Sequence, residues 1–159
     1  MTSQRYVSFL VVGDKVTVVH ADVPNDVAEP ISIVSDSTWK MQDGDRAASL
    51  DALYKRCSSH LAEHPVDQIV VKASAVSTGS ATRALLESAE SRGVVIAAAA
   101  AEGTTVSALS KASISRTYGG RKVDEYLKDD QFWDENTKGG KLRKTSREAV
   151  MLIVAKRGK

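Results

Sequence analysis

Two apolar segments near the N-terminus are separated by only two residues, and this spacing limits the fold. Residues 5–12 (RYVSFLVV) and 15–21 (KVTVVHA) are typical of strands, and Gly13-Asp14 between them is a hairpin turn signal. Two residues cannot hold a helix, so the two strands are predicted to be antiparallel neighbours. This excludes a doubly wound sheet, in which a helix would join the first two strands.

A third strand and a long helix are predicted next. Pro24 and Asn25 end the second strand, and residues 31–35 (ISIVS) indicate a third strand before a polar loop that contains Trp39. A helix is predicted to start after Asp45, a favoured N-cap residue, and to end before Pro65. Its apolar residues recur at helical spacing: Leu50, Leu53, Cys57 and Leu61.

The middle of the chain predicts a strand on either side of a second helix. Residues 67–73 (DQIVVKA) are typical of a buried fourth strand. Thr78 or Ser80 would cap the helix, and Gly93 lies where a C′ glycine would end it. The apolar face of this helix would carry Ala81, Leu85 and Ala89. Residues 94–100 (VVIAAAA) then predict a fifth strand, built from small residues that allow close packing.

The C-terminal third predicts short helices and a long final one. Residues 104–112 (TTVSALSKA) indicate a short helix, and after the Gly119-Gly120 break residues 121–133 (RKVDEYLKDDQFW) indicate another. Residues 138–141 (KGGK) are typical of a polar loop, and residues 145–156 predict a buried helix. A T-x-x-E capping box would open that helix, formed by Thr145 and Glu148.

The order of these elements predicts an α/β fold with a five-stranded mixed sheet. Three antiparallel strands come first, two parallel strands follow, and the helices pack against the sheet. A length of 159 residues favours a single domain over residues 1–159.

Basic residues are concentrated in a C-terminal segment, residues 138–159. This segment carries eight Lys or Arg residues and Glu148 as its only acid, so a chain of net charge +2 has −5 on residues 1–137. Such asymmetry indicates an anionic partner, although a solvated tail would have the same composition. The single cysteine, Cys57, excludes a disulfide framework. The apolar run at the N-terminus is too short for a signal peptide or a membrane span, so we expect a cytoplasmic protein with no membrane partner.

Several segments form a pattern that is similar to a known family. They are HPVDQIVVK (64–72), STGSATRALLESAESRG (77–93), VVIAAAA (94–100), SISRTYGGRKVDEYL (113–127) and REAVMLIVA (147–155). Together with the element order, these segments resemble the RuvC-type resolvases, a branch of the ribonuclease H-like fold, over roughly residues 5–157. The resemblance implies a ribonuclease H-like fold for the predicted sheet. It also implies that a homodimer is one form to consider, because small RuvC-like proteins are often dimeric.

The resemblance implies a metal site in active members, and this chain departs from it. Active members hold two divalent metals with carboxylates on the first strand, at the end of the fourth strand and at the start of the last helix. Here the matching positions are near Leu10, at Lys72 and at Glu148, which has Arg147 beside it. A lysine in place of a carboxylate inverts the local charge. We therefore expect no cofactor and no two-metal catalysis.

Other candidate groups have simpler structural interpretations. Asp14 and Asp22 lie at turns and Glu102 in a loop, where short acidic side chains are common. The three histidines do not form a metal-ligand spacing with the cysteine; they are His20, His60 and His64.

Three functions remain open at this point. The first is a non-catalytic RuvC-like protein that binds DNA, RNA or a nucleic-acid-processing partner through a basic face, with Lys72 either paired with Glu148 or facing a phosphate. The second is a divergent Mg²⁺-dependent nuclease, similar to a Holliday junction resolvase, that uses Glu148 with Asp14 or Asp22. The third is a protein-interaction subunit or homodimer. The predicted nucleic-acid-binding residues are Lys72, Arg116, Arg121, Lys122, Lys141, Arg143, Lys144 and Arg147.

Two adjacent aromatic residues bear on the third function. Phe132 and Trp133 would mark the contact of an interaction subunit if they are exposed. The same residues would anchor a loop in the core if they are buried.

Overall fold

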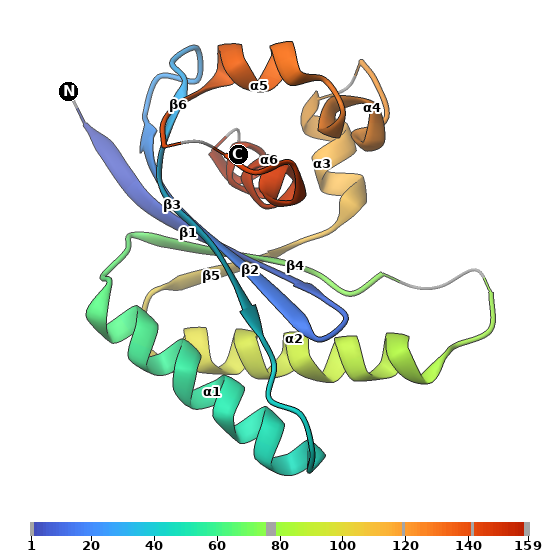
Figure 1. The fold of residues 1–159 in the computed structure, drawn as a ribbon. Helices are drawn as coiled ribbons and strands as arrows, with labels where there is room; N and C mark the ends of the chain where they lie inside the picture. The colour runs from blue at the N-terminus through green and yellow to red at the C-terminus, as the bar shows by residue number, and fades with distance from the viewer. Residues whose placement is uncertain (1, 76–78, 119, 141, 158–159) are drawn as a thin grey trace.

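A mixed sheet of six strands forms the centre of the computed structural model, which describes residues 2–75, 79–118, 120–140 and 142–157 (Figure 1). The strand order is β5-β4-β1-β2-β3-β6. The strands are β1 (Ser3–Val12), β2 (Lys15–Pro24), β3 (Ile31–Lys40), β4 (Gln68–Lys72), β5 (Thr105–Leu109) and β6 (Thr137–Gly139).

The predicted antiparallel start of the sheet is confirmed. β1 and β2 pair along their whole length, from Ser3 opposite Pro24 to Val12 opposite Lys15, and β2 pairs antiparallel with β3. β4 then pairs parallel with β1, and β5 parallel with β4. β3 is longer than predicted, so Trp39 lies in the strand, where its ring packs edge-on against Phe9 at 5.9 Å between centroids.

The sixth strand was not predicted. Residues 138–141 were expected to form a loop, but β6 covers Thr137–Gly139 and pairs parallel with β3. Gly139 has φ +88°, and a Cβ at this position would lie 2.8 Å from the carbonyl oxygen of Ile33. The glycine therefore lets the backbone approach β3 more closely than a side chain would allow.

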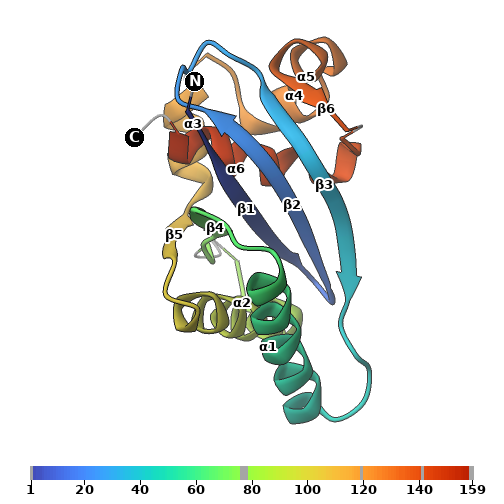
Figure 2. The ribbon, with the colours of Figure 1, turned by 90° about the vertical axis from the view of Figure 1, so that its left-hand side faces the viewer.

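Helices cover both faces of the sheet. α1 and α2 lie on one side, and α3, α4, α5 and α6 lie on the other (Figure 1, Figure 2). The helices are α1 (Arg46–Glu63), α2 (Arg83–Ala101), α3 (Lys111–Tyr118), α4 (Val123–Leu127), α5 (Asp130–Asn136) and α6 (Arg147–Arg157), with a 3₁₀ turn, η1 (Lys144–Ser146), before α6. In the described ranges, no helix has the length and apolar character needed to cross a membrane.

Alternation along β1 divides the core into two parts. Val7, Phe9 and Val11 point toward α1 and α2, whereas Tyr6 and Leu10 point toward α6. The face that carries α1 buries Leu53, Cys57 and Leu61, three of the residues predicted from helical spacing. Asp45 caps this helix as predicted, because its Oδ2 accepts a hydrogen bond from the Ala48 amide at 2.9 Å.

The largest error of the sequence prediction lies between residues 93 and 112. Residues 94–100 were predicted as a strand but form the second half of α2, and Gly93 lies inside that helix. Residues 104–112 were predicted as a helix, but β5 covers Thr105–Leu109. The helix N-cap is Thr82, whose Oγ1 accepts from the Leu85 amide, rather than Ser80; Thr78 lies outside the described residues.

Helix propensity explains this error. A short apolar run fits a buried strand and a buried helix equally well, so its period cannot decide between them. Five consecutive alanines, residues 97–101, favour the helix because alanine has the highest helix propensity. The helix ends instead at Glu102 and Gly103, and Gly103 has the positive φ (+80°) typical of a helix terminus.

The C-terminal helices also differ from the prediction. Residues 121–133 form α4 and the start of α5 instead of one helix, because Asp129 begins a new helix by accepting from the Phe132 amide. Trp133 is 3% exposed, and its Nε1 donates to the Tyr126 carbonyl oxygen at 2.8 Å. It is therefore a core anchor and cannot mark an exposed contact. The Gly119-Gly120 break lies partly outside the described residues, since residue 119 is not among them.

Replacement of Gly93 by alanine tests the corrected course of α2. Gly93 is in the helix interior, and no atom lies within 4 Å of a Cβ built there. We expect Gly93→Ala to increase the free energy of unfolding by about 0.5–1 kcal/mol, because alanine loses less conformational entropy in a helix. Gly139→Ala is the matched control, and it should destabilise the protein. Urea unfolding measures both, and destabilisation by Gly93→Ala would contradict the helix assignment.

Candidate functional site

The candidate site lies where β4 ends beneath the start of α6. Lys72 is the last residue of β4, and its Nζ donates to Glu148 Oε1 at 2.5 Å. The two side chains are only 22% and 20% exposed. A lysine can end this apolar strand because its ammonium meets a carboxylate at the point where it leaves the core.

The neighbouring position on β1 is apolar. β1 and β4 are parallel, with Phe9 opposite Val71, so Leu10 lies beside Lys72. Leu10 is 3% exposed and belongs to the core beneath α6. The strand therefore contributes no oxygen ligand at this position.

Arg92 of α2 is a second cation near Glu148, and the sequence analysis did not identify it. Its Nη2 donates to the Val11 carbonyl oxygen at 3.0 Å and its Nη1 to Ser74 Oγ at 3.3 Å. Burial lowers the pKa of Arg92, and the charge of Glu148 acts in the opposite direction. Lys72 therefore binds Glu148 directly, and Arg92 lies near enough for its charge to interact with the same carboxylate.

Several solved structures have the same architecture as this chain. Thermus thermophilus RuvC matches with a TM-score of 0.73 at 11% identity, over 95% of this chain and 92% of that one. A second structure of it, titled as a complex with a Holliday junction substrate, gives 0.70 at 10% identity over 95% and 91%. The yeast mitochondrial Holliday junction resolvase Ydc2 gives 0.63 at 10% identity over 96% and 78%.

The chain has a RuvC-like, ribonuclease H-like fold. This confirms the fold expected from the resemblance, with six strands in place of five. No family model and no curated protein sequence matches the chain. At this level of identity the likeness concerns the fold alone.

The residues around Lys72 and Glu148 do not fit a pair of divalent metals. Such a pair needs several oxygen ligands around it, whereas here Leu10 and Lys72 flank Glu148. Among residues 2–75, 79–118, 120–140 and 142–157, no group of three or more His, Cys, Asp or Glu has an arrangement that could hold a metal ion. We therefore derive no chemical step through a metal here.

The other acids considered from the sequence lie elsewhere. Asp22 accepts hydrogen bonds from the Arg5 guanidinium near the opposite end of β1. Asp14 lines a cavity on the α1 and α2 side of the RuvC-like sheet. Glu102 is the C-cap of α2. The structure therefore does not bring Asp22 or Glu102 to Glu148.

Glu148 and Thr145 do not take the roles of a capping box. The described chain enters α6 through the 3₁₀ turn η1, in which the Ser146 amide donates to the Arg143 carbonyl oxygen. The Glu148 carboxylate instead binds Lys72, which lies 76 residues earlier in the chain. Pairing with a distant lysine was one of the two roles left open by the sequence.

Asp36 of β3 holds the η1 turn in place. Its carboxylate accepts from the Arg143 backbone amide, from the Arg143 guanidinium at 2.7 Å and from Ser146 Oγ at 2.6 Å. Burial alone would raise the pKa of Asp36, but these hydrogen bonds together lower it below its usual value. The sequence analysis missed Asp36 because its predicted third strand ended at residue 35.

Most of the predicted basic residues are paired in the RuvC-like fold. Arg121 binds Asp129 at 2.9 Å and lies over the Tyr126 ring. Lys144 and Arg147 both approach Asp130, at 3.7 and 2.7 Å.

These basic residues differ in exposure. The Lys144 side chain is 74% exposed and that of Arg143 is 44%, whereas Arg147 is 7% exposed and also donates to the Leu127 carbonyl oxygen. Lys122 is exposed at the start of α4. Lys141 and the side chain of Arg116 lie outside the described residues.

Three histidines that are distant in sequence form a cluster. His20 Nε2 lies 2.7 Å from His60 Nε2, and the His60 and His64 rings stack with centroids 4.4 Å apart. Burial first, and then the neighbouring imidazoles, lower the pKa of His20 to about 4. The cluster was not predicted because His20 on β2 meets the end of α1 only in the folded chain.

A double-mutant cycle on Lys72 and Glu148 measures the central ion pair. We expect Lys72→Met and Glu148→Gln to show a coupling energy of about 1–3 kcal/mol, because each single change leaves a partly buried charge without its partner. Urea unfolding of the two single variants and the double variant gives this value. The exposed Asp51–Lys55 pair is the control, and little coupling is expected there. Equal coupling in both pairs would contradict a partly buried bridge.

The histidine cluster predicts a loss of stability at acidic pH. His20 binds a proton at about pH 6.5 when unfolded but only at about pH 4 when folded, so the unfolded state binds more protons between these values. The contribution of neutral His20 to the free energy of unfolding is fully present above pH 6.5. It falls by about 3 kcal/mol as the pH drops to 4. Urea unfolding across this pH range measures how steeply the free energy of unfolding depends on pH. This pH dependence should be weaker in His20→Gln, and an unchanged pH dependence would contradict the role of His20.

Proposed function

We propose that the protein binds nucleic acid through phosphate contacts and does not cleave it by two-metal chemistry. The Lys72–Glu148 pair carries this proposal. The resemblance implies a cluster of carboxylates at this place. The structure has a single carboxylate there, Glu148, and its charge is balanced by the cations Lys72 and Arg92. A divalent cation would be repelled by both of them, whereas an anionic oxygen would be attracted.

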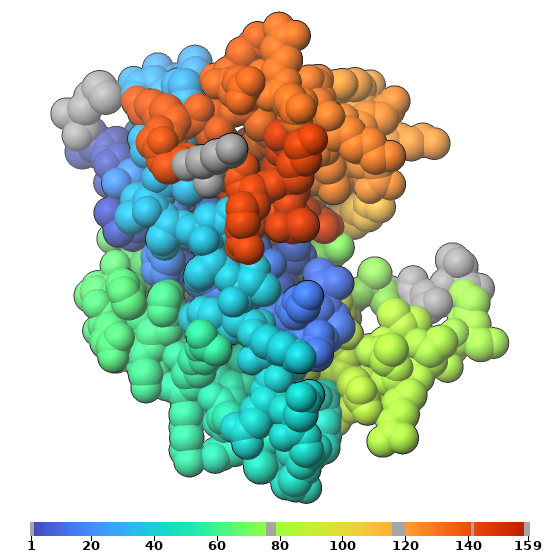
Figure 3. All heavy atoms as spheres, viewed as in Figure 1, coloured from blue at the N-terminus to red at the C-terminus, as the bar shows by residue number. Residues whose placement is uncertain are grey.

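Exposed cations beside this edge supply candidate phosphate contacts. Arg143 lies directly before η1 and Lys144 is the first residue of this turn, and Figure 3 shows the segment at the surface. The contact of Lys144 with Asp130 is long and exposed, so exchanging it for a phosphate costs little. Arg121, Lys122, Lys141 and Arg116 remain further predicted contacts. Arg147 is the weakest candidate, because a phosphate would have to displace buried interactions.

The choice of nucleic acid to test follows from the structural neighbours. One of the matching RuvC structures is titled as a complex with a Holliday junction substrate. We therefore propose branched DNA as the first ligand, ahead of duplex and single strands. A nuclease that uses Glu148, a nucleic-acid-processing protein partner and a homodimer remain alternatives. Sedimentation velocity tests the homodimer.

Gel-shift measurements across a salt series test this function. Four-way, duplex and single-stranded DNA and RNA are compared with and without Mg²⁺ and Mn²⁺. We expect binding that weakens steeply with salt, because phosphate contacts release counterions, and we expect intact substrate in every lane. Lys144→Gln should reduce the salt slope by about 1 if it removes one phosphate contact. Lys55→Gln is the control, since Lys55 lies on α1 across the sheet.

Two outcomes would overturn the proposal. Metal-dependent cleavage that Glu148→Gln abolishes would show the nuclease instead. Absence of binding even at low salt would leave the interaction subunit as the remaining function.

A further inference from the structure

The second half of α2 is apolar around its whole circumference. Residues 93–101 (GVVIAAAAA) contain no polar side chain. A helix with this composition is normally buried on all sides. Within α2, however, only three of these residues are buried, namely Val95, Ala98 and Ala99. The remaining apolar surface of the helix is therefore more than a single copy of this fold covers.

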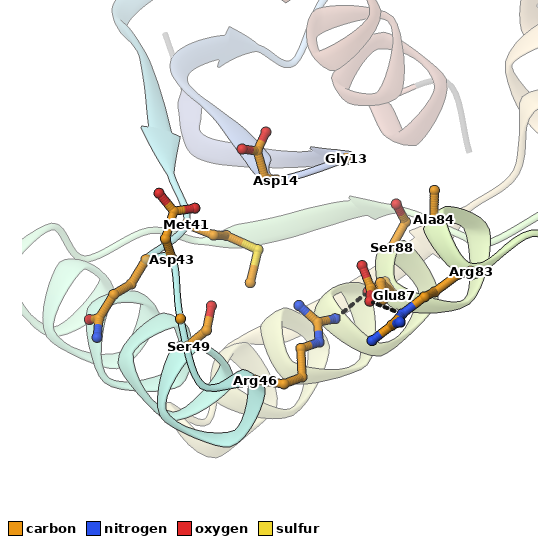
Figure 4. Close-up of a pocket in the computed structure, with 12 residues that line it drawn as sticks. Gly13, Asp14, Met41, Asp43, Arg46, Ser49, Arg83, Ala84, Glu87 and Ser88 are labelled. Carbon is orange, nitrogen blue, oxygen red and sulfur yellow. Dashed lines mark hydrogen bonds and ion pairs between the residues drawn. The ribbon is translucent and has the colours of Figure 1, made fainter.

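Two sides of α2 are covered by the rest of the chain. On the sheet side, Val95 and Ala98 belong to the core that includes β1 and β4. On the α1 side, Arg46 reaches across to α2 and donates to the Glu87 carbonyl oxygen at 2.7 Å and to Ser91 Oγ at 3.3 Å (Figure 4). These contacts leave the third side of the helix open to solvent.

The open side carries a continuous apolar surface, which we call the α2 stripe. Leu85 is 47% exposed and Leu86 is 59% exposed, and no atom lies within 4 Å of a Cβ built at Gly93. At 3.6 residues per turn, the members of the stripe lie within about a third of the helix circumference. They are Leu85, Leu86, Ala89, Gly93, Ile96, Ala97 and Ala100. The stripe is thus bulky at its N-terminal end and flat along the rest of its length.

This shape is complementary to itself when two copies of α2 run antiparallel. A two-fold axis at Gly93 would place Leu86 of each copy against Ala100 of the other, and Ala89 against Ala97. Each large side chain would then meet a small one. The glycine at the centre would let the two helices approach closely, because the distance between packed helices depends on the side chains at the contact. A two-fold contact uses every such pair twice.

Charges at the two ends of the stripe favour the same orientation. The Arg83 side chain is 92% exposed at the N-terminal end, and Glu102 is exposed at the C-terminal end. An antiparallel pair would bring Arg83 of each copy beside Glu102 of the other, whereas a parallel pair would bring like charges together. The contact of Arg83 with Glu87 is an exposed pair within one helix, so it offers little resistance to this exchange.

We propose that the α2 stripe binds a second copy of this chain in an antiparallel, two-fold contact centred on Gly93. The contact does not rest on the proposed nucleic-acid binding. A membrane surface fits the stripe less well, because Glu87 and Glu90 flank it where membrane-binding helices carry Lys and Arg. One pair of helices is small beside the roughly 800 Å² per partner of a standard interface, so we expect a dissociation constant in the micromolar range.

Sedimentation velocity over a concentration series tests the dimer. We expect monomer at about 1 μM and dimer at about 500 μM, as a micromolar dissociation constant requires. Ala97→Glu should weaken dimerisation by at least about tenfold, because it buries a charge between the helices. Ala112→Glu is the matched control, since Ala112 is an exposed alanine of α3 on the other face of the sheet. Leu86→Glu is a second variant if Ala97→Glu does not fold.

Charge reversal tests the orientation of the two copies. Arg83→Glu and Glu102→Arg should each weaken dimerisation by about threefold to tenfold, because each places like charges at both ends of the contact. The double variant should restore it. A monomer at every concentration, a dimer that Ala97→Glu leaves unchanged, or a double variant no better than the single ones would overturn the proposal. A methyl group at the centre would separate the copies, so the unfolding of Gly93→Ala is compared on dilute, monomeric protein.

Discussion

Burial of β1 on both faces is the constraint on which the rest of the structure depends. Six consecutive residues, Tyr6–Val11, are buried, so the strand needs a neighbour on each edge and a helical layer on each face. The hairpin supplies β2 on one edge, and the return of the chain through α1 supplies β4 on the other. α1 and α2 then cover one face and α6 covers the other. Because β1 and β4 are parallel, their carboxyl ends meet under the start of α6, which creates the edge where Lys72 emerges.

The charge at that edge decides what it can bind. A lysine alone at the end of a buried strand would be costly, and Glu148 makes it tolerable by approaching from α6. Arg92 reaches the same place from the opposite layer, so the three charges come from β4, α6 and α2. A group of one carboxylate and two cations retains a positive charge after internal pairing. It therefore suits an anionic oxygen better than a divalent cation, whatever the ancestry of the fold.

The sequence predicted those parts of the molecule in which local patterns are unambiguous. The Gly13-Asp14 turn, the Asp45 cap and the first two strands were all predicted correctly, because each depends on neighbouring residues only. The alanine run after Gly93 was misread because its length and apolarity fit two structures, and helix propensity decided between them. β6 was missed because three residues containing a glycine form a strand only when β3 is beside them.

The candidate site was harder to predict than the fold, because its contacts join residues that are distant in the sequence. Lys72 and Glu148 were identified because the resemblance named their positions. Arg92, Asp36 and the partners of His20 carry no local signal, since their contacts join residues 18 or more apart in the sequence. Charges that meet only through tertiary structure are invisible to patterns read along the chain.

The β1–β2 hairpin separates two environments of different charge. On the α6 side the groups at the sheet edge are Lys72, Arg92 and the cations of η1, which attract phosphate. On the α1 and α2 side, Asp14 and Asp43 line the cavity and would repel a phosphate backbone. A nucleic acid bound at the first surface would therefore not extend into the second.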